Sequence, residues 1–328
     1  MNRIFICIAA YNEERTILKT LKFLENSLKQ IRLKQKPVIL VGLNGCSDNT
    51  KDIVARVKQT YKFPLKIVNS SKGKLRAHKE MIKHVEGQGS VLFLDADVLV
   101  PSSTIESIIS CLDQNPKLKI VSAYPYVLKP SSLKGIKKFT YYILNLKRIL
   151  PKIEIAKEDV TDYHGAEIKD NFLKKSRIYF HGRCFAIRNK GIYAFPAENS
   201  LIRGDDTFLS FAILKKQPRQ SVKVLYDAPV YSYPEFSFAN YLRAWHRIRK
   251  DLDNIYEEYP EFLEIGKKTE MIINWDYVIK ELSFSYKIYA LGFFILKKFE
   301  AASYALFKKK IDIDKLWSYS DKSAGREK

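Results

Sequence analysis

Two aspartates separated by a single alanine, Asp95 and Asp97, follow directly after the apolar run at residues 91–94. Carboxylates at the end of a buried strand are costly unless a cation or hydrogen-bond donors compensate their charge. Their oxygens favour Mg²⁺ or Mn²⁺, ions that commonly bind substrate phosphates as well. The alternative is a solvated surface loop. Because the apolar run places the pair at a strand end, we favour a metal site.

A basic loop precedes this pair in the chain. Lys72, Lys74 and Arg76 surround Gly73 directly after another apolar run. Positive side chains around a glycine can neutralise a diphosphate, because the glycine lets the backbone approach the ligand closely. An ordinary basic turn is the alternative for this loop taken alone. Beside an acidic metal site on one sheet edge, the loop suits a nucleoside diphosphate.

A second acidic pair, Asp205 and Asp206, follows Gly204 and opens a helix with Phe208 and Leu209 on its apolar side. Acidic residues in the first turn complement the helix dipole, which is the purely structural interpretation. The functional interpretation is a general base, a carboxylate that takes the proton from an attacking hydroxyl. The two interpretations are compatible.

A third group of functional side chains, Arg243, Trp245, His246 and Arg247, lies within one and a half helical turns. The two arginines are four residues apart, share a helix face and can together bind phosphate or a carboxylate. The tryptophan can stack on a sugar or pack in the core. The histidine is a further candidate metal ligand.

The elements that position these residues alternate between strand-like and helix-like patterns. Residues 13–28 carry an apolar residue every three or four positions, as in an amphipathic helix. Repeated βα units predict an α/β fold with a mainly parallel twisted sheet flanked by helices, in which ligands bind beyond the carboxyl ends of the strands. Continuous apolar runs, typical of strands buried on both faces, occur at 4–9, 38–43, 65–68 and 91–94.

The pattern changes in the second half of the chain. Residues 151–180 are polar and without periodicity, which indicates a loop or lid, and a strand is predicted again at 180–187. We expect a sheet domain over 1–235, with 133–180 as a loop or insertion on the membrane or acceptor side. Aromatic-rich helices and a basic tail are expected over 236–328.

Composition limits the class of protein. The 328 residues are 46% hydrophobic and carry a formal net charge of +21, which excludes a disordered chain and favours polyanionic partners. The four cysteines form no CxxC pair, so we expect reduced thiols in a cytoplasmic protein rather than a zinc site or a disulfide framework. No apolar stretch approaches the length of about 20 residues that a spanning helix needs.

Together these motifs resemble those of the family 2 glycosyltransferases, which have the GT-A fold. The similarity extends over roughly residues 4–250. The motifs that carry it, in chain order, are 8–14, 41–50, 72–74, 95–97 and 205–206.

The resemblance implies a UDP- or GDP-sugar donor, a divalent cation and inversion at the anomeric carbon. It implies that Asp97 binds the metal and that Asp206 is the base that activates a hydroxyl acceptor, lipid-linked or part of a glycan. Gly182, Asp205, Arg243, Trp245 and Arg247 are expected on the acceptor or diphosphate side. The positions expected to bind the nucleotide sugar are Ala9, Tyr11, Glu13, Asn44, Lys74, Asp95 and Ala96.

The sequence departs from the family pattern at two points. Leu43 and Asn44 stand where many members have two aspartates before the loop glycine, which makes the identity of the donor less certain. Ala244 precedes Trp245, so the Gln-x-x-Arg-Trp motif of processive members is absent. We therefore expect transfer of single sugars rather than polymerisation.

Two segments are candidates for contact with the inner face of the cell membrane. The first is 133–150, an apolar stripe flanked by lysines that suits a helix lying on anionic lipid. The second is the group Tyr289, Phe293, Phe294 and Leu296, which either contacts the membrane or packs against the catalytic domain.

Two other function classes stay open at this point. A nucleic-acid-binding protein would explain the charge and the aromatic content, although the basic residues are dispersed and no recognition module is present. A nucleotidyltransferase would also use carboxylate-bound Mg²⁺ and a basic loop. It would release pyrophosphate instead of a nucleoside diphosphate.

Overall fold

The computed structural model describes residues 3–32, 35–87, 89–157, 180–216 and 221–312. These residues form two compact units. We call the first the sheet unit, which comprises the described residues of 3–125 and 180–232, and the second the helical unit, which comprises those of 126–157 and 233–312. Most of the loop expected at 151–180, and the polar tail, lie outside the described residues.

Four adjacent parallel strands form one half of the main sheet. Their order is β3-β2-β1-β4, and each contains one of the apolar runs that predicted a strand. Burial on both faces explains why these segments are apolar throughout. The bounds are Ile4–Ala10 for β1, Val38–Asn44 for β2, Leu65–Ser70 for β3 and Ser90–Asp95 for β4.

The other half of the sheet is mixed. β8 pairs antiparallel with β4 and with β6, and β9 pairs antiparallel with β5, so the order continues β4-β8-β6-β9-β5. Within the segment predicted as a strand at 180–187, only the last four residues belong to β8. The bounds are Val98–Leu99 for β5, Ile120–Val127 for β6, Cys184–Ile187 for β8 and Val222–Ser232 for β9.

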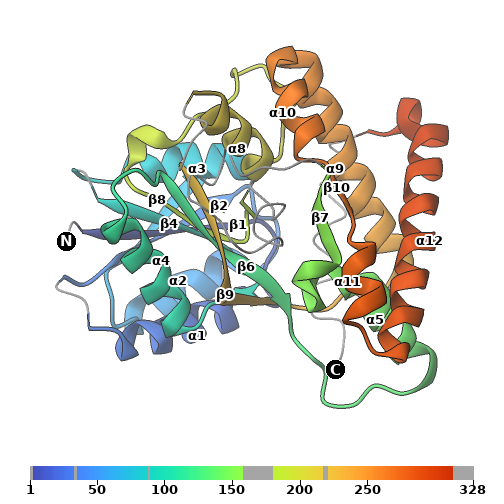
Figure 1. Ribbon diagram of the computed structural model, residues 1–328. Coiled ribbons are helices and arrows are strands. Elements are labelled where there is room, and N and C mark those ends of the chain that lie inside the picture. The colour runs from blue at the N-terminus through green and yellow to red at the C-terminus, as the bar shows by residue number, and fades with distance from the viewer. Residues whose placement is uncertain (1–2, 33–34, 88, 158–179, 217–220, 313–328) are drawn as a thin grey trace. The chain divides into compact units, whose positions relative to one another are not determined.

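Helices cover both faces of this sheet (Figure 1). The apolar stripes of α1, α2 and α4 share one core with the strands, through residues such as Leu21, Val54 and Ile105. On the other face, Met81 of α3 packs so closely that a Cβ at Gly42 would lie 3.0 Å from its sulfur. The bounds are Ile17–Gln30 for α1, Thr50–Thr60 for α2, Lys74–Ile82 for α3, Ser102–Gln114 for α4, Lys190–Ile192 for the 3-10 turn η2 and Asp205–Lys216 for α8.

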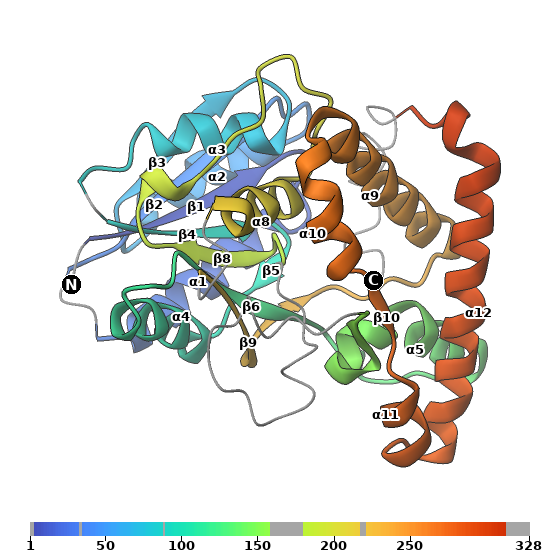
Figure 2. The same ribbon diagram turned by 45° about the horizontal axis from the view of Figure 1, so that its top comes forward.

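The helical unit is organised around α5 and α12, which run side by side in Figures 1 and 2. Gly292 permits this approach, because a Cβ there would lie 2.6 Å from the Cδ1 atom of Ile143. The helices are α5 (Gly135–Ile149), α9 (Phe238–Glu258), α10 (Leu263–Lys268), α11 (Trp275–Lys280) and α12 (Phe284–Phe307). The shorter elements are η1 (Pro151–Ile153), β7 (Glu154–Ala156), η3 (Pro260–Phe262), β10 (Met271–Ile273) and η4 (Lys308–Lys310), with β7 and β10 paired antiparallel.

The structure excludes three residues from the candidate membrane contacts, and the other candidates at 133–150, Tyr289 and Phe294 stay predictions. Phe293 and Leu296 are buried in the core of the helical unit together with Leu146 of α5, so these three side chains cannot contact lipid. The apolar inner faces of α5 and α12 thus cover each other and are removed from water. Within the described residues, no helix is both long and apolar enough to span a membrane. The four cysteines are unpaired, as expected.

Candidate active site

The carboxyl ends of the parallel strands bring the predicted site residues to one edge of the sheet. In the register of β1, Ala9 lies opposite Gly42 on one side and opposite Asp95 on the other. Asn44 and Ser70 are partners at the ends of β2 and β3. The strand order thus places the 8–14, 41–50 and 95–97 motifs beside one another.

The loops after β1 and β2 are joined by hydrogen bonds. Asn12 has a positive φ of 54°, and its side-chain oxygen accepts from the backbone N–H of Ser47 at 2.8 Å. The backbone N–H of Glu13 donates to the hydroxyl of Thr50 at 2.7 Å, and the Glu13 carboxylate accepts from Thr16. These contacts explain why polar residues cluster in both motifs: they hold the two loops together.

The basic loop lies against the loop after β1. The ammonium of Lys72 lies 4.8 Å from the centre of the Tyr11 ring, within the range of a cation–π contact. Gly45 has a φ of 79°, and a Cβ there would meet Lys72 at 3.3 Å. The glycine therefore allows the loops after β2 and β3 to approach each other closely.

Asn44 has an unsatisfied side-chain oxygen at this edge. Asn44 is only 4% exposed, and its Oδ1 atom has no hydrogen-bond partner among the described residues. The hydroxyl of Ser70, its register partner, is also buried without one. Buried polar atoms are normally hydrogen-bonded, so two unsatisfied acceptors here are consistent with a ligand that donates to them.

Lys74 connects the two acidic motifs. Its Nζ atom lies 2.7 Å from Oδ1 of Asp95 and 3.2 Å from Oδ1 of Asp205, and it donates to the carbonyl oxygen of Gly182 at 3.2 Å. We expected this lysine to neutralise a diphosphate. In the structure it neutralises two carboxylates that approach one another from β4 and α8.

Asp205 is the most deeply placed acid of the site, at 3% exposed. Burial raises the pKa of its carboxyl to about 7, with the charge of Lys74 opposing the shift and that of Asp206 adding to it. His78 Nδ1 lies 3.5 Å from Asp205 Oδ2 and 2.7 Å from the hydroxyl of Tyr193. Burial, and then the charge of Lys74, lower the pKa of His78, so the imidazole is neutral.

A dependence of stability on pH follows from Asp205. Its pKa is about 7 in the folded chain and 3.8 in the unfolded chain, so between these values the native state binds a proton that the unfolded state does not. The contribution of this group to the free energy of unfolding therefore falls as pH rises from about 4 to 7, by about 1 kcal/mol per pH unit.

We expect Asp205→Asn to remove this dependence of the free energy of unfolding on pH. Urea unfolding of both proteins at pH 4.5 to 7.5 measures it, with the exposed Asp227→Asn on β9 as control; equal slopes for wild type and Asp205→Asn would contradict the assignment.

Asp206 is held by backbone groups. Its Oδ2 atom accepts from the N–H of Gly182 at 2.9 Å, and its Oδ1 atom accepts from the N–H of Thr207 at 2.8 Å. A Cβ at Gly182 would lie 3.2 Å from Oδ2 of Asp206 and from Oδ1 of Asp205. A larger residue at position 182 would force these carboxylates to shift, so glycine is favoured there.

Asp97 supplies one carboxylate beside Asp95. Its Oδ2 atom lies 3.8 Å from the guanidinium of Arg183, and burial raises the pKa of the carboxyl. Among the described residues, no group of three or more His, Cys, Asp or Glu side chains is arranged to bind an ion. Mg²⁺ usually combines one or two carboxylates with water and substrate phosphates, so a single carboxylate such as that of Asp97 fits such a site.

The predicted residues of α9 belong to the helical unit. His246 Nε2 lies 2.9 Å from the Ser303 hydroxyl, and the ring of Trp245 meets that of Tyr304 at a centroid distance of 5.8 Å. Arg243 is exposed and pairs with Asn240 on the same helix, and Arg247 is half-buried. Trp245 therefore packs against α12, and the roles predicted for these four residues stay predictions.

Sequence reasoning missed three residues of the site: His78, Tyr193 and Arg183. His78 follows Lys74 by four residues on α3, so helical spacing alone would have placed both on one face. Arg183 is adjacent to Gly182. Tyr193 carried no signal in the sequence, since it reaches His78 only through the fold.

Comparison with known proteins gives the family. The model of the family described as Glycosyl transferase family 2 matches residues 5–193. Two curated relatives are poly-beta-1,6-N-acetyl-D-glucosamine synthases, one of Staphylococcus epidermidis, 30% identical over 128 residues, and one of Staphylococcus aureus (strain COL), 29% identical. Each match spans 39% of this chain and only 30% of the synthase.

Solved structures share the fold. The mannosyltransferase PcManGT from Pyrobaculum calidifontis, solved with GDP-Man and Mn²⁺, is 17% identical with a TM-score of 0.53, over 97% of this chain and 84% of that one. A fragment of S. aureus TarS in complex with UDP-GlcNAc is 15% identical with a TM-score of 0.50, over 88% and 78%. These similarities confirm the GT-A fold. With a family match that covers more than half of its length, the chain belongs to glycosyl transferase family 2.

Proposed function

We propose that this family member transfers a single sugar, with inversion, from a UDP- or GDP-sugar to the hydroxyl of a lipid-linked or glycan acceptor. The observation that carries the proposal is that Lys74 forms ion pairs with both Asp95 and Asp205. These contacts bring the end of β4 and the start of α8 together. Family membership supports glycosyl transfer over nucleic-acid binding and over nucleotidyl transfer.

The donor is a nucleoside diphosphate sugar in this proposal. The solved structures that share the fold bind GDP-Man or UDP-GlcNAc, and the edge formed by β1 to β3 offers the unsatisfied oxygen of Asn44. A donor N–H or ribose hydroxyl can satisfy that oxygen. Tyr11 and Lys72 lie at the same edge, where an aromatic ring and a positive charge suit a base and a phosphate.

A divalent cation completes the donor site in this proposal. Asp97 would hold Mn²⁺ or Mg²⁺ together with the diphosphate, and the bound ion would offset the charge that develops on the leaving group. One of the solved relatives contains Mn²⁺. Arg183 lies 3.8 Å from Asp97 and partly compensates the charge of this carboxylate when no donor is bound.

Asp206 is the proposed base. Backbone N–H groups of Gly182 and Thr207 orient its carboxylate, so the side chain cannot rotate freely away from an acceptor hydroxyl. Lys74 and Gly182 connect this carboxylate to the donor side through Asp95. One hydrogen-bonded arrangement thus positions the base relative to the donor, as an in-line displacement requires.

Donor binding tests the proposal. With Mn²⁺ present, we expect one class of nucleotide sugar to raise the melting temperature of the wild type, because binding stabilises the folded state by mass action. Asn44→Leu should weaken that binding by about tenfold, since one buried hydrogen bond is worth about 1.5 kcal/mol. Calorimetric titration gives the affinity. Ile53→Leu, a substitution on α2 outside the site, serves as control.

Two results would contradict the proposal. The first is a wild type that neither UDP- nor GDP-sugars stabilise. The second is an Asn44→Leu variant that binds the donor as tightly as the wild type, which would remove Asn44 from the nucleotide site.

A further inference from the structure

α12 has an apolar outer face that nothing in the helical unit covers. Its inner face packs against α5 and α9. On the opposite side Phe284, Ile288, Leu291 and Ile295 recur every three or four positions, and Leu306 lies further along the same face. A helix that is apolar on all sides is normally buried, so this face requires a partner. The exposed fractions are 78% for Phe284, 45% for Ile288, 55% for Leu291, 61% for Ile295 and 77% for Leu306.

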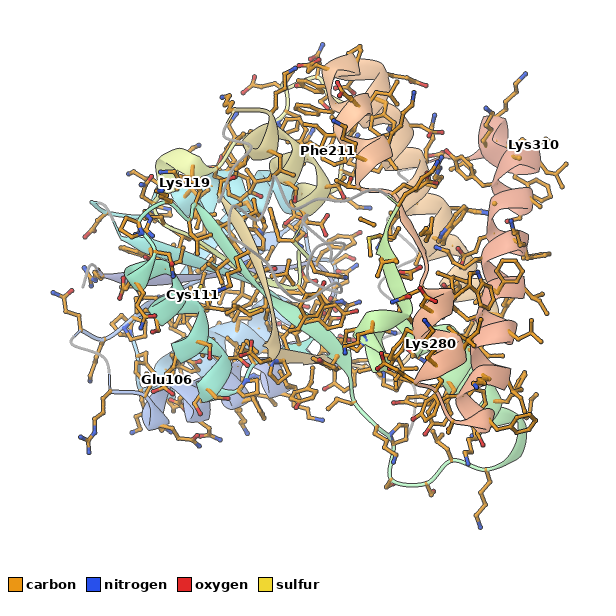
Figure 3. All side chains as sticks on the ribbon, in the orientation of Figure 1. Glu106, Cys111, Lys119, Phe211, Lys280 and Lys310 are labelled. Carbon is orange, nitrogen blue, oxygen red and sulfur yellow. The ribbon has the colours of Figure 1, made fainter. Side chains whose placement is uncertain are left out.

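The exposed charged residues of α12 and η4 are all positive. Lys287 and Lys298 are the only ones within α12, and Lys308–Lys310 follow in η4. None of these five lysines forms an ion pair with any described residue, and Lys310 projects from the end of the helix in Figure 3. The single acid of α12, Glu300, is completely buried on the inner side, where Lys297 lies 3.9 Å from it.

We infer that the outer face of α12, defined by Phe284, Ile288, Leu291, Ile295 and Leu306, binds the surface of an anionic lipid bilayer. Apolar side chains along one face of a helix enter the acyl boundary, while flanking lysines contact acidic headgroups. The helix then lies in the plane of the membrane.

A second copy of the chain fits this face less well. A symmetric contact would place the same surface on both sides and bring the unpaired lysines of one copy towards those of the other. Anionic headgroups neutralise the same lysines. The exposed ring of Trp275 on α11, 5.4 Å from that of Phe294, adds an aromatic of the kind enriched at membrane interfaces.

This inference deepens the proposed function and rests on it for one point, that a lipid-linked acceptor places the substrate at a membrane. It assigns the membrane contact to residues other than Phe293 and Leu296, for which the sequence left membrane contact and packing open. Phe293 and Leu296 pack against α5 in the core of the helical unit. The residues proposed to contact lipid lie on the opposite side of the same helix.

Vesicle flotation of the full chain tests the inference. We expect the wild type to float with phosphatidylcholine vesicles that contain 30% phosphatidylglycerol and much less with phosphatidylcholine alone. Ile295→Glu should lower binding to the anionic vesicles by about tenfold or more, because it puts a negative charge into the apolar face. Lys287→Glu/Lys298→Glu should abolish the preference for anionic lipid, because it replaces two positive charges that face acidic headgroups with negative ones.

The matched control is Ile248→Glu, an equally exposed isoleucine on α9, which should bind vesicles like the wild type. Equal loss in both isoleucine variants, or a wild type that does not float, would overturn the inference. Unchanged flotation of Ile295→Glu together with a loss of dimer in analytical ultracentrifugation would assign the face to a second copy. Donor-induced thermal stabilisation of the same variants reports on the proposed function separately, so a failure of either one is recognised.

Discussion

Asp206→Asn should lower the rate of sugar transfer by about 10³-fold while the affinity for the nucleotide sugar stays within about twofold. The amide cannot take the proton of an acceptor hydroxyl. The loss therefore falls on kcat, since donor contacts lie at the ends of β1 to β4 in this proposal. Steady-state kinetics and a separate donor titration measure the two quantities.

The control for this substitution has to account for stability. Both oxygens of Asp206 accept from backbone N–H groups, so the amide of asparagine faces one of those donors and costs about 1 kcal/mol. Thermal unfolding shows whether the variant is folded at the assay temperature, and Asp227→Asn provides an exposed match. An active Asp206→Asn beside an inactive Asp205→Asn would transfer the role of base to Asp205.

Lys74→Met should lower the free energy of unfolding by about 3 kcal/mol or more. The lysine is the cation closest to both Asp95 and Asp205, and Asp205 is almost fully buried. Methionine fills similar space but leaves both carboxylates uncompensated. Urea unfolding at pH 8, where the Asp205 carboxyl is ionised, measures the loss.

Lys79→Met provides the matched control for Lys74→Met. Lys79 lies on the same helix, but its ion pair with Glu198 is exposed, and exposed ion pairs contribute little to the free energy of unfolding. Adding Asp205→Asn to Lys74→Met should recover part of the loss, because the two side chains interact directly. Similar losses for both lysine variants would show that Lys74 does not neutralise the acidic pair.

Much of the sheet unit could be predicted from local patterns. Strands β1 to β4 are continuous apolar runs, and α1 carries its apolar residues at helical spacing, because burial on one or two faces selects residue types directly. The half of the sheet with antiparallel pairing could be predicted less well. β5 is two residues long, and β8 covers only half of the predicted strand, so too few positions carry a pattern.

The aspartate pairs, the basic loop and Asn44 could be identified from the sequence as candidate site residues, because each stands at the end of a strand or the start of a helix with a clear local pattern. Their contact partners could be identified only in the folded chain. Lys74 reaches Asp205 across more than a hundred residues of chain, and His78 meets Tyr193 in the same way. The faces of α12 were decided similarly, since all its sides are apolar and only packing against α5 shows which one is buried. Local patterns record how a residue type suits burial or exposure, whereas a contact between distant segments depends on how the whole chain folds.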